Sequence, residues 1–506
     1  MSEVSSAIKS LKSGKAAGID EIRPEMLKAL NNGGIRWLAR ICAVVWKTGE
    51  APADWQTGIV IPIFKKGDQR ECSNYKGITL LSLPGKVFAR IIERRCRQIV
   101  EPQIQENQCG FCAGRSTTDQ IFTLQQIIEK SWEFAKPIYA LFVDLEKAYD
   151  RVPRNILWNV LKEYDIQDQL LSAIQSLYKN CQSCVRINGS KSDNFQVQVG
   201  LRQGCVLSPL LFIIFMDKIS RTSANPACAQ IGDVKMDSLL FADDIARLTT
   251  SETSLPVALN QLGKVCLEYG MKICEKKTEL MVISRENKPT NLHLNNNPLN
   301  QVNKFKYFGV QFSSDGKQDG EIDRRIGAAS GVLRSLYCSV VTKAELSKKT
   351  KLSIFKSVYR PTLIYGPEHW VLTEKLRSRI QAAEMRFPRR ISGLTLRDKI
   401  RSTDIRESLQ IEPLLQYIER SQLRWLGHII RMQHNRLPYQ IFEAKPIGKR
   451  PVGRPRTSWR KYMDKLSLER LNLQWPEVQQ AATDRIRWKQ LLNALTPRPV
   501  RIRGRK

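Results

Sequence analysis

The amino-acid sequence predicts an α+β fold that is followed by a helical, basic C-terminal region. Helical runs alternate with three short apolar segments, at residues 58–64, 138–143 and 238–242, which have the length and residue types of buried strands. Apolar residues make up 42% of the 506-residue chain and charged residues 26%, which excludes a disordered or collagen-like chain. A chain of this length can bury a large core without disulfides.

The helices are predicted from apolar residues at helical spacing. Three helices are expected within residues 1–50; the second begins at Pro24, and the third, from Trp37 to Trp46, is apolar enough to be buried. Longer helices are expected farther along, at residues 84–100, 255–270 and 321–340. Stretches rich in Pro with Asn or Gly predict linkers, at residues 286–300 and 446–455.

Positive charge is concentrated toward the C-terminus. The net charge is +32, and residues 1–320 hold 41 basic and 33 acidic side chains. Residues 321–444 hold 23 and 12, and residues 445–506 hold 17 and 4. A solubility tail is one interpretation, but aromatic residues are interleaved with these charges, which a purely solvating segment lacks. We therefore expect a polyanionic partner, most often nucleic acid.

The cysteines favour reduced thiols over a metal site. Two Cys-x-x-Cys pairs begin at Cys109 and Cys181, but Cys181 lies 69 positions after Cys112 and no histidine pattern completes a zinc ribbon. Reduced thiols are typical of intracellular proteins. The N-terminus has no signal-peptide pattern, and the longest apolar stretch has 12 residues, which is too short to cross a bilayer. We expect no membrane partner.

Three aspartates follow predicted strands. Asp144 ends the strand at 138–143, and Asp243 and Asp244 end the strand at 238–242. Because adjacent strand residues point to opposite faces, the last two can serve one site only if the chain turns there, which predicts a hairpin with the acids at its tip. Three converging carboxylates would repel one another unless divalent cations lay between them, and Mg²⁺ prefers such oxygen ligands. An acidic surface turn is the alternative interpretation.

A glycine-rich loop precedes an apolar helix. Its residues Arg202, Gln203 and Gly204 combine polar side chains with a backbone that permits close approach of a ligand. Ser208 is predicted to cap the following helix and Pro209 to occupy its first position. Such a loop can hold a nucleotide or a template base, whereas a simple turn into a helix would not need the Arg-Gln-Gly cluster.

Six segments occur in an order that identifies a family. They are Tyr75-Lys-Gly-Ile-Thr-Leu-Leu81, Gln108-Cys-Gly-Phe111, Gly114-Arg-Ser-Thr-Thr-Asp119, Phe142-Val-Asp-Leu-Glu-Lys-Ala-Tyr-Asp150, the Arg-Gln-Gly loop, and Phe241-Ala-Asp-Asp244. Together they resemble the reverse transcriptases of non-LTR (LINE-type) retrotransposons over about residues 5–325. The resemblance implies a right-hand polymerase with fingers, palm and thumb.

The resemblance implies an RNA-directed DNA polymerase that adds dNTPs to a primer 3′-hydroxyl by two-metal phosphoryl transfer. Its partners would be an RNA template, a DNA primer, target DNA and dNTPs, in the nucleus and also in the cytoplasm with its RNA. Its four parts would be a helical extension, fingers with palm, a helical thumb-like region and a basic tail, at residues 1–57, 58–325, 326–444 and 445–506. The oligomeric state is not predicted.

Residue roles are carried over from the same resemblance. Asp144, Asp243 and Asp244 would be the catalytic acids and hold two Mg²⁺ ions. Nucleotide contacts would come from six residues, Lys65, Tyr149, Arg202, Gln203, Gly204 and Lys277. Tyr149 would crowd the sugar 2′ position and so select deoxynucleotides, and Lys277 would give a proton to the pyrophosphate. Nucleic-acid contacts would come from Arg115 and from Lys306 and Tyr307, which belong to a hairpin that positions the primer end.

The basic tail adds further nucleic-acid candidates. Arg450, Arg454 and Arg456 lie in a Gly-Lys-Arg-Pro-Val-Gly-Arg-Pro-Arg segment that resembles the core of an AT-hook, although a basic linker fits equally well. Three tryptophans that follow can either stack on bases or form a small helical core, namely Trp459, Trp475 and Trp488.

Several departures from the family pattern support a second hypothesis. Cys112 replaces a usual Arg, Pro388 interrupts a helical run, and Arg247 lies in a strand that should be buried, where it must reach solvent, pair with an acid or destabilise the palm. We also expect the chain to lack the upstream endonuclease and the C-terminal zinc knuckle of the family. The alternative is therefore a catalytically decayed remnant that retains only nucleic-acid binding.

Overall fold

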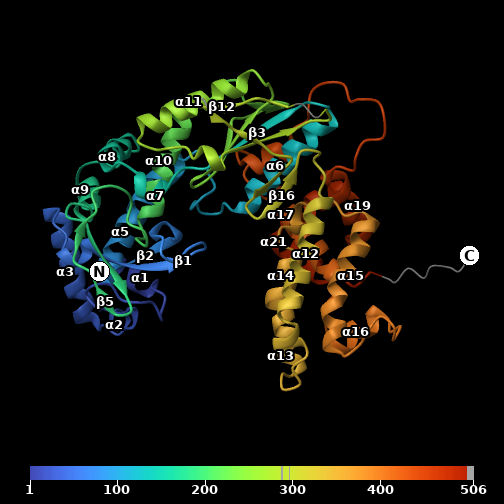
Figure 1. Cartoon of the computed structure of the whole chain (residues 1–506), viewed down its shortest axis with the longest axis horizontal. Coiled ribbons are helices and arrows are strands. Elements are labelled where there is room, and N and C mark those ends of the chain that lie inside the picture. Colours follow the sequence, from blue (N-terminus) through green and yellow to red (C-terminus); the bar gives the residue numbers. More distant parts are fainter. Residues whose placement is uncertain (287–288, 296, 499–506) are drawn as a thin grey trace, which may run out of the picture.

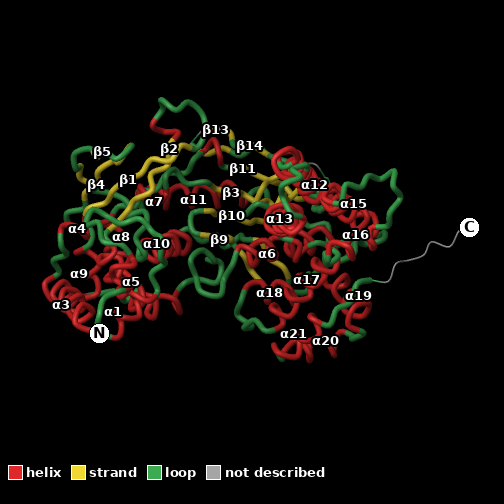
Figure 2. Tube along the Cα trace, turned by 90° about the horizontal axis from the view of Figure 1, so that it is seen from below, coloured by secondary structure: helices red, strands yellow, loops and turns green. Residues whose placement is uncertain are grey.

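The computed structural model describes residues 1–286, 289–295 and 297–498 and forms an arch (Figure 1). The N-terminal helices and one sheet form the first side of the arch, a second sheet lies at its top, and the C-terminal helices form the other side. Figure 2 shows the strands in yellow through the middle of the molecule, with the C-terminal helices at one end. The strands and helices predicted from the sequence therefore fall into an α+β arrangement.

Short helices open the chain. They are α1 (Ser2–Lys9), α2 (Pro24–Lys28), α3 (Asn32–Thr48) and α4 (Ala53–Gln56). Pro24 is the first residue of α2, as predicted. The prediction that the run from Trp37 to Trp46 is buried was wrong for one face of α3. Leu38 and Val45 enter the core, but Trp37 is 65% exposed, because α3 lies on the outside of the arch and only its inner stripe meets other helices.

The first sheet has strand order β2-β1-β4-β5, with β6 also paired to β4. β1 is antiparallel to β2 and parallel to β4. The strands are β1 (Thr57–Phe64), β2 (Tyr75–Leu81), β4 (Gln182–Ile187), β5 (Ser190–Lys191) and β6 (Phe195–Gln196), with a 3₁₀ turn η1 (Cys72–Asn74) before β2. The strand predicted at 58–64 is thus confirmed as β1.

The second sheet, called here the central sheet, carries the aspartates. Its order is β14-β11-β3-β10-β9, with β3 in the middle. The strands are β3 (Ile138–Val143), β9 (Ser238–Phe241), β10 (Asp244–Thr249), β11 (Glu279–Ile283) and β14 (Asn300–Gln301). β3 is buried on both faces: Leu141 enters one apolar core and Phe142 another. A continuous apolar strand, rather than an alternating one, is what such burial requires.

Helices cover the sheets, and small hairpins join them. The helices are α5 (Leu83–Val100), α6 (Thr117–Glu133), α7 (Ala148–Arg151), α8 (Arg154–Glu163), α9 (Asp168–Ser176), α10 (Ser208–Thr222) and α11 (Ser254–Glu268), with the 3₁₀ turns η2 (Glu101–Gln103) and η3 (Glu275–Lys277). The hairpins are β7 (Ala229–Ile231) with β8 (Val234–Met236), β12 (His293–Leu294) with β13 (Asn297–Pro298), and β15 (Lys304–Tyr307) with β16 (Val310–Ser313). Residues 287, 288 and 296 of the linker predicted at 286–300 lie outside the described residues.

The C-terminal region is helical, as predicted. Its elements are α12 (Asp319–Ser335), η4 (Tyr337–Val341), α13 (Lys348–Ile354), η5 (Phe355–Tyr359), α14 (Arg360–Leu363), η6 (Pro367–His369), α15 (Glu374–Ile391), α16 (Ser402–Leu409), α17 (Leu414–Ile430), α18 (Leu437–Glu443), α19 (Trp459–Leu471), α20 (Trp475–Thr483) and α21 (Arg485–Asn493). The interruption predicted at Pro388 was wrong. Pro388 lies inside the last turn of α15, which continues to Ile391.

One apolar core holds these C-terminal helices together. Trp370, Trp459 and Trp488 are fully buried in it, so Trp459 and Trp488 form a helical core and do not present their rings to bases. The core takes residues from both sides of position 444, and the domain boundaries stay predictions. Residues 499–506 of the basic tail lie outside the described residues. Within the described ranges, no helix combines the length and the apolar character that crossing a membrane requires.

Candidate active site

The three aspartates meet at one end of the central sheet. Ile245 pairs with Val143 in the antiparallel register of β10 and β3, so the next pair along places Asp244 opposite Asp144. Phe241 pairs with Asp244, and Ala242 and Asp243 form the turn between β9 and β10. Ala242 has a φ of 58°, in the left-handed region, which lets the chain reverse within two residues. The predicted hairpin with acids at its tip is confirmed.

Burial and the neighbouring negative charges make ionisation of Asp243 and Asp244 less favourable. Asp243 and Asp244 reach solvent, yet the surrounding protein removes enough water to raise the pKa of both. The charge of Asp144 adds to this rise at Asp243, and the charges of Asp243 and Asp144 add to it at Asp244, whose pKa reaches about 6. A group of carboxylates that repel one another in this way is stabilised by added positive charge.

A lysine supplies positive charge to part of this site. Lys277 Nζ lies 3.2 Å from Asp144 Oδ2, and this hydrogen bond raises the pKa of Lys277. In the described part of the chain, no group of three His, Cys, Asp or Glu side chains is arranged closely enough to hold a metal ion. The donor set itself suits a hard divalent cation, because all three ligands would be carboxylate oxygens.

Tyr149 lies close to the acids, on α7. Its ring stacks on Phe212 of α10 with 4.2 Å between ring centroids, so the side chain has a fixed orientation. The ring is only partly buried, and burial together with the charge of Asp243 raises the pKa of its hydroxyl. The steric role of Tyr149 that the resemblance implies stays a prediction.

The glycine-rich loop is braced from within. Arg202 is 7% exposed and donates to the Leu177 carbonyl at 3.1 Å. Its side chain was predicted to contact a nucleotide, but in the structure it points toward the protein interior. Gln203 Nε2 donates to Asp150 Oδ1 at 2.7 Å. Gly204 has a φ of 88°, and a Cβ there would lie 2.6 Å from the Thr79 carbonyl of β2. Only glycine lets the loop approach β2 this closely.

The predicted cap of α10 was wrong in one detail. Leu207 is the N-cap residue, and Ser208 is the first residue within the helix. The Ser208 hydroxyl donates back to the Arg202 carbonyl at 2.8 Å, which ties the loop to the helix start. Lys65, another predicted nucleotide contact, is exposed just after β1.

The predicted primer hairpin is present as β15 and β16. Lys306 is exposed on it, but Tyr307 is 4% exposed and packs against Phe142 with 5.6 Å between centroids. The structure thus places Tyr307 in the core, where it cannot contact nucleic acid. Phe308 at the tip packs against Phe241, 5.1 Å away, directly before the acidic turn.

An ion cluster on α12, absent from the sequence-based predictions, holds this hairpin tip. Arg324 Nη2 donates to the Gly309 carbonyl at 2.6 Å, and Arg325 donates to the same oxygen. Both guanidinium groups pair with Glu321, which is 2% exposed and also accepts from the Gln311 amide at 2.9 Å. One feature of the sequence could have predicted these ion pairs. Glu321 precedes Arg324 by three residues and Arg325 by four, a spacing that places oppositely charged side chains side by side on a helix.

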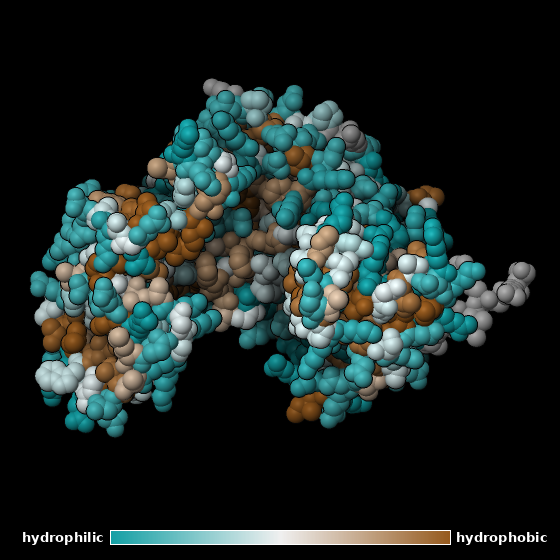
Figure 3. All heavy atoms as spheres, turned by 60° about the horizontal axis from the view of Figure 1, so that its bottom comes forward, coloured by the Kyte–Doolittle hydropathy of each residue, from teal (hydrophilic) through white to brown (hydrophobic). Residues whose placement is uncertain are grey.

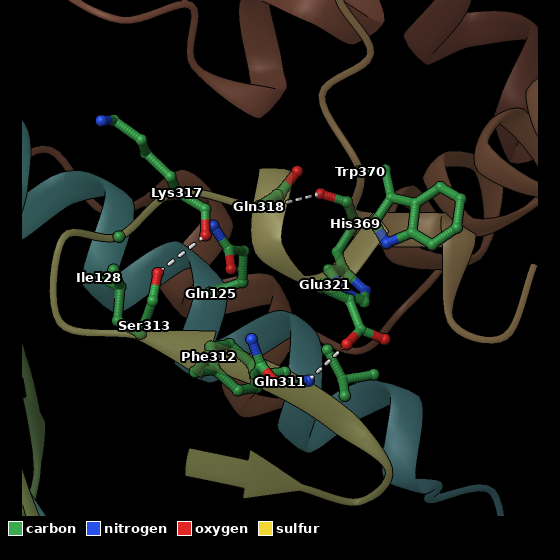
Figure 4. Close-up of a pocket in the computed structure, with 12 residues that line it drawn as sticks. Gln125, Ile128, Gln311, Phe312, Ser313, Lys317, Gln318, Glu321, His369 and Trp370 are labelled. Carbon is green, nitrogen blue, oxygen red and sulfur yellow. Dashed lines mark hydrogen bonds between the residues drawn. The ribbon is translucent and has the colours of Figure 1, made fainter. Parts of the chain in front are cut away.

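A small cavity lies behind the hairpin (Figure 4). β16 residues Gln311, Phe312 and Ser313 line it from one side, and His369 of η6 lines it from the side of the C-terminal helices. Its volume of about 10 Å³ is near the minimum for a single water molecule, so it is not a substrate site. Burial and the charge of Arg325 lower the pKa of His369 to about 3, which leaves it neutral.

The Arg115 side chain makes its bonds within the protein. Its guanidinium donates to the carbonyls of Gln105 and Gln108 at 2.7 and 2.6 Å and pairs with Glu106 at 2.7 Å. These bonds keep the side chain away from the nucleic-acid contact that was predicted for it.

The predicted AT-hook-like segment lies along the end of α6. Arg450 pairs with Glu133 at 2.8 Å, and Arg456 stacks over the Trp132 ring at 4.2 Å while donating to the Asp315 carbonyl. Arg454 is exposed. Two of the three arginines are therefore engaged within the protein, as in a basic linker.

The hollow between the two sides of the arch is open to solvent (Figure 3). The central sheet, whose strands β9 and β10 are joined by the acidic turn, lies between the first sheet and the C-terminal helices (Figure 1). The cavity behind the hairpin, in contrast, has room for about one water molecule.

Comparison with known proteins agrees with this geometry. Residues 63–312 match the family described as reverse transcriptase (RNA-dependent DNA polymerase). The chain is 26% identical to a probable RNA-directed DNA polymerase from transposon X-element of Drosophila melanogaster, over 90% of this chain and 50% of the relative. It is 25% identical to the corresponding protein from transposon BS (88% and 50%) and 24% identical to that of mobile element jockey (82% and 46%), from the same organism.

The chain spans about half the length of these curated relatives. Among solved structures it is similar to an apo telomerase of Candida tropicalis truncated from its C-terminal domain. That likeness has a TM-score of 0.39 and 15% identity, over 56% of this chain and 60% of the other, and we draw nothing from it. The α+β fold, with its acids on a central palm sheet, is that of a right-hand polymerase. Residues 63–312 belong to the reverse transcriptase family, and the relatives to which the chain is similar support its non-LTR (LINE-type) branch.

Proposed function

We propose that this protein is an RNA-directed DNA polymerase of a LINE-type retrotransposon. It extends a DNA primer on an RNA template, and the primer 3′-hydroxyl attacks the α-phosphate of a dNTP while pyrophosphate leaves. The convergence of Asp144, Asp243 and Asp244 at the end of the palm sheet carries this proposal. We further propose that it acts in the nucleus, where target DNA lies.

The acids would hold two Mg²⁺ ions. Burial and, after it, the charges of the neighbouring aspartates raise the pKa of Asp243 and Asp244, which supports a site that is completed by cations. Bound there, the ions would favour the deprotonated primer hydroxyl and neutralise charge on the leaving pyrophosphate.

Residues around the acids have separate tasks in this proposal. Tyr149, held against Phe212, occupies space next to Asp243 and so excludes a ribose 2′-hydroxyl. Lys277 lies within hydrogen-bond distance of Asp144 and can donate a proton to the departing pyrophosphate. Lys65, which is exposed just after β1, and Gln203, which is bonded to Asp150, would contact the incoming nucleotide.

A decayed remnant that only binds nucleic acid is the competing hypothesis. Its strongest argument was the buried Arg247, but Arg247 has Asp237 as an ion-pair partner and Ser223 as a hydrogen-bond partner. Pro388 is likewise accommodated within α15. The polymerase is therefore the better supported of the two.

Primer extension on a poly(rA)/oligo(dT) substrate with Mg²⁺ tests the proposal. We expect wild-type protein to extend the primer and Asp243→Asn/Asp244→Asn to lose extension by about 10³-fold or more, because the charge that holds the metal ions is removed. Asp233→Asn is a matched control: Asp233 is an exposed acid in the β7–β8 turn, and its loss should leave the rate unchanged.

Absence of extension by folded wild-type protein would favour the remnant, provided that the duplex still binds with an affinity that falls steeply as salt rises. Equal extension by wild type and the double variant would show that another site, or a contaminating polymerase, does the chemistry.

A further inference from the structure

The segment Asn107–Gly110 runs beside the end of β9, immediately before the acidic turn. The Leu240 amide donates to the Asn107 carbonyl, and the Cys109 amide donates to the Leu240 carbonyl, both at 2.9 Å. These two bonds form a parallel bridge between Gln108 and Leu240. The segment thus extends the palm sheet by one short partner, outside its named strands.

The Gln108 side chain reaches from this segment into the turn itself. Gln108 is 0% exposed, and its Oε1 accepts hydrogen bonds from the Ala242 amide at 3.0 Å and the Gly110 amide at 2.8 Å. Ala242 is the residue with the left-handed φ between β9 and Asp243. Because a buried amide without an acceptor keeps the full cost of its desolvation, this contact stabilises the turn in its observed shape.

Gly110 permits the contact by bringing its backbone against the turn. A Cβ at Gly110 would lie 2.3 Å from the Ala242 nitrogen and 2.9 Å from the Phe241 carbonyl carbon. No side chain fits in that space, so the segment and the turn are packed backbone to backbone. Gln108 and Gly110 together fix where residues 241–243 lie.

A second buried glutamine acts on a different part of the same structure. Gln120 of α6 donates from Nε2 to the carbonyls of Asn107 at 2.7 Å and Leu240 at 2.9 Å. Both of its hydrogen bonds therefore join the segment to β9 and not to the turn residue Ala242. Among the side chains of the described residues, only that of Gln108 accepts a hydrogen bond from the Ala242 amide.

We propose that Gln108 is a positioning residue for the acids: its side-chain oxygen holds the Ala242 amide and thereby sets Asp243 and Asp244 relative to Asp144. As a role in catalysis this rests on the polymerase function proposed above. It goes further by assigning the geometry of the acidic turn to a residue 134 positions earlier in the chain, which touches no substrate. A loose turn would hold the acids in several arrangements, of which only one binds both ions.

The test is Gln108→Met in the full chain, which keeps the length of the side chain and removes the acceptor. Gln126→Met is the matched control, since Gln126 is a buried glutamine of α6 (1% exposed) with no recorded bond to the turn. Hydrogen exchange of the peptide that contains Ala242 is measured first. We expect faster exchange there in Gln108→Met, and wild-type exchange in Gln126→Met.

Steady-state extension is measured second. We expect Gln108→Met to lower kcat by about 10- to 100-fold and to raise the Mg²⁺ concentration at half-maximal rate, while KM for the primer–template stays within about twofold. A purely structural role would lower the amount of folded enzyme without moving the Mg²⁺ dependence. If Gln108→Met does not fold, Gln108→Asn serves instead, because it keeps an amide but withdraws it from Ala242.

Unchanged exchange at Ala242 in these variants overturns the proposal, whatever the activity. Faster exchange with unchanged kcat and Mg²⁺ dependence also overturns it. The bond from Gln108 would then stabilise the turn without affecting catalysis. Faster exchange in a protein whose wild type extends no primer leaves the contact to the turn in place and instead contradicts the proposed polymerase function.

Discussion

Arg247 of β10 forms an ion pair with Asp237, which lies just before β9. The pair closes the β9–β10 hairpin at the end opposite the acidic turn. Arg247 is 1% exposed, and its second amino group donates to the Ser223 hydroxyl after α10. Burial lowers the pKa of Arg247 to about 10, so it remains a cation at neutral pH and needs this partner.

Removing the acid should therefore destabilise the palm. Asp237→Ala leaves Arg247 as a buried charge without its counter-ion. We expect the free energy of unfolding to fall by about 3 kcal/mol. This value is at the low end for buried ion pairs because the Asp237 side chain is 18% exposed. Adding Arg247→Met to this variant should recover most of the loss. Thermal unfolding of both variants checks this, and an Asp237→Ala midpoint equal to wild type would contradict it.

Glu129 should make stability depend on pH. It accepts from the Trp459 amide at 2.9 Å, where α6 meets the start of α19, and burial raises its pKa from 4.5 to about 7. The folded protein then binds a proton that the unfolded chain has released, so stability falls as pH rises from about 4.5 to 7. The nearby charge of Lys130 opposes this rise, and that of Glu133 adds to it.

Glu129→Gln keeps the acceptor oxygen and removes the charge. We expect its unfolding midpoint to exceed that of wild type at pH 8, with the difference closing at pH 5. Glu252→Gln, at an exposed position, makes the same change in net charge and should show no such divergence. Parallel midpoint curves for Glu129→Gln and wild type would refute the assignment.

Tyr149→Val should admit ribonucleotides. The ring that stacks on Phe212 is shortened to two methyl groups, which opens space near Asp243. We expect the preference for dTTP over UTP, measured as the ratio of kcat/KM on poly(rA)/oligo(dT), to fall by about 10- to 200-fold. Tyr149→Phe keeps the ring and should retain the preference. A loss of preference in Tyr149→Phe would point to the hydroxyl instead of the ring.

Arg325→Met should loosen the β15–β16 hairpin. It removes one of the two guanidinium groups that donate to the Gly309 carbonyl and one partner of the buried Glu321. We expect KM for the primer–template to rise about tenfold, since one charge-assisted hydrogen bond is lost. Arg334→Met removes the same charge from an exposed position of α12 and should have a much smaller effect. Equal effects would mean that charge alone, rather than the hairpin contact, sets KM.

Local patterns in the sequence located the acids. The apolar runs before Asp144 and Asp243 predicted strands, and the change of character after Asp244 predicted the hairpin, because side-chain alternation and turn chemistry are properties of neighbouring residues. The order of the six motifs identified the family for the same reason: each is a short stretch of consecutive residues. The helical C-terminal region was likewise evident from its spacing.

Side-chain direction at long polar residues was not predictable in this way. Arg115, Arg202 and Tyr307 were predicted to contact ligands and instead bond or pack within the protein. The partners of Arg202 and Tyr307 come from segments that meet only when the chain folds, as do Arg456 with Trp132 and Arg325 with Gly309. Those of Arg115 lie within 10 positions of it, but the shape of the loop that brings them together is not evident from residue types.

The sequence by itself thus determined the elements, the family and the position of the three acids. The tertiary structure decided what holds them in place. Gln108 was part of a quoted motif without a role, and its bond to Ala242 spans 134 positions. A hydrogen bond depends on the distance between two atoms in space, and for residues so far apart in the chain that distance is set by the packing of the whole palm.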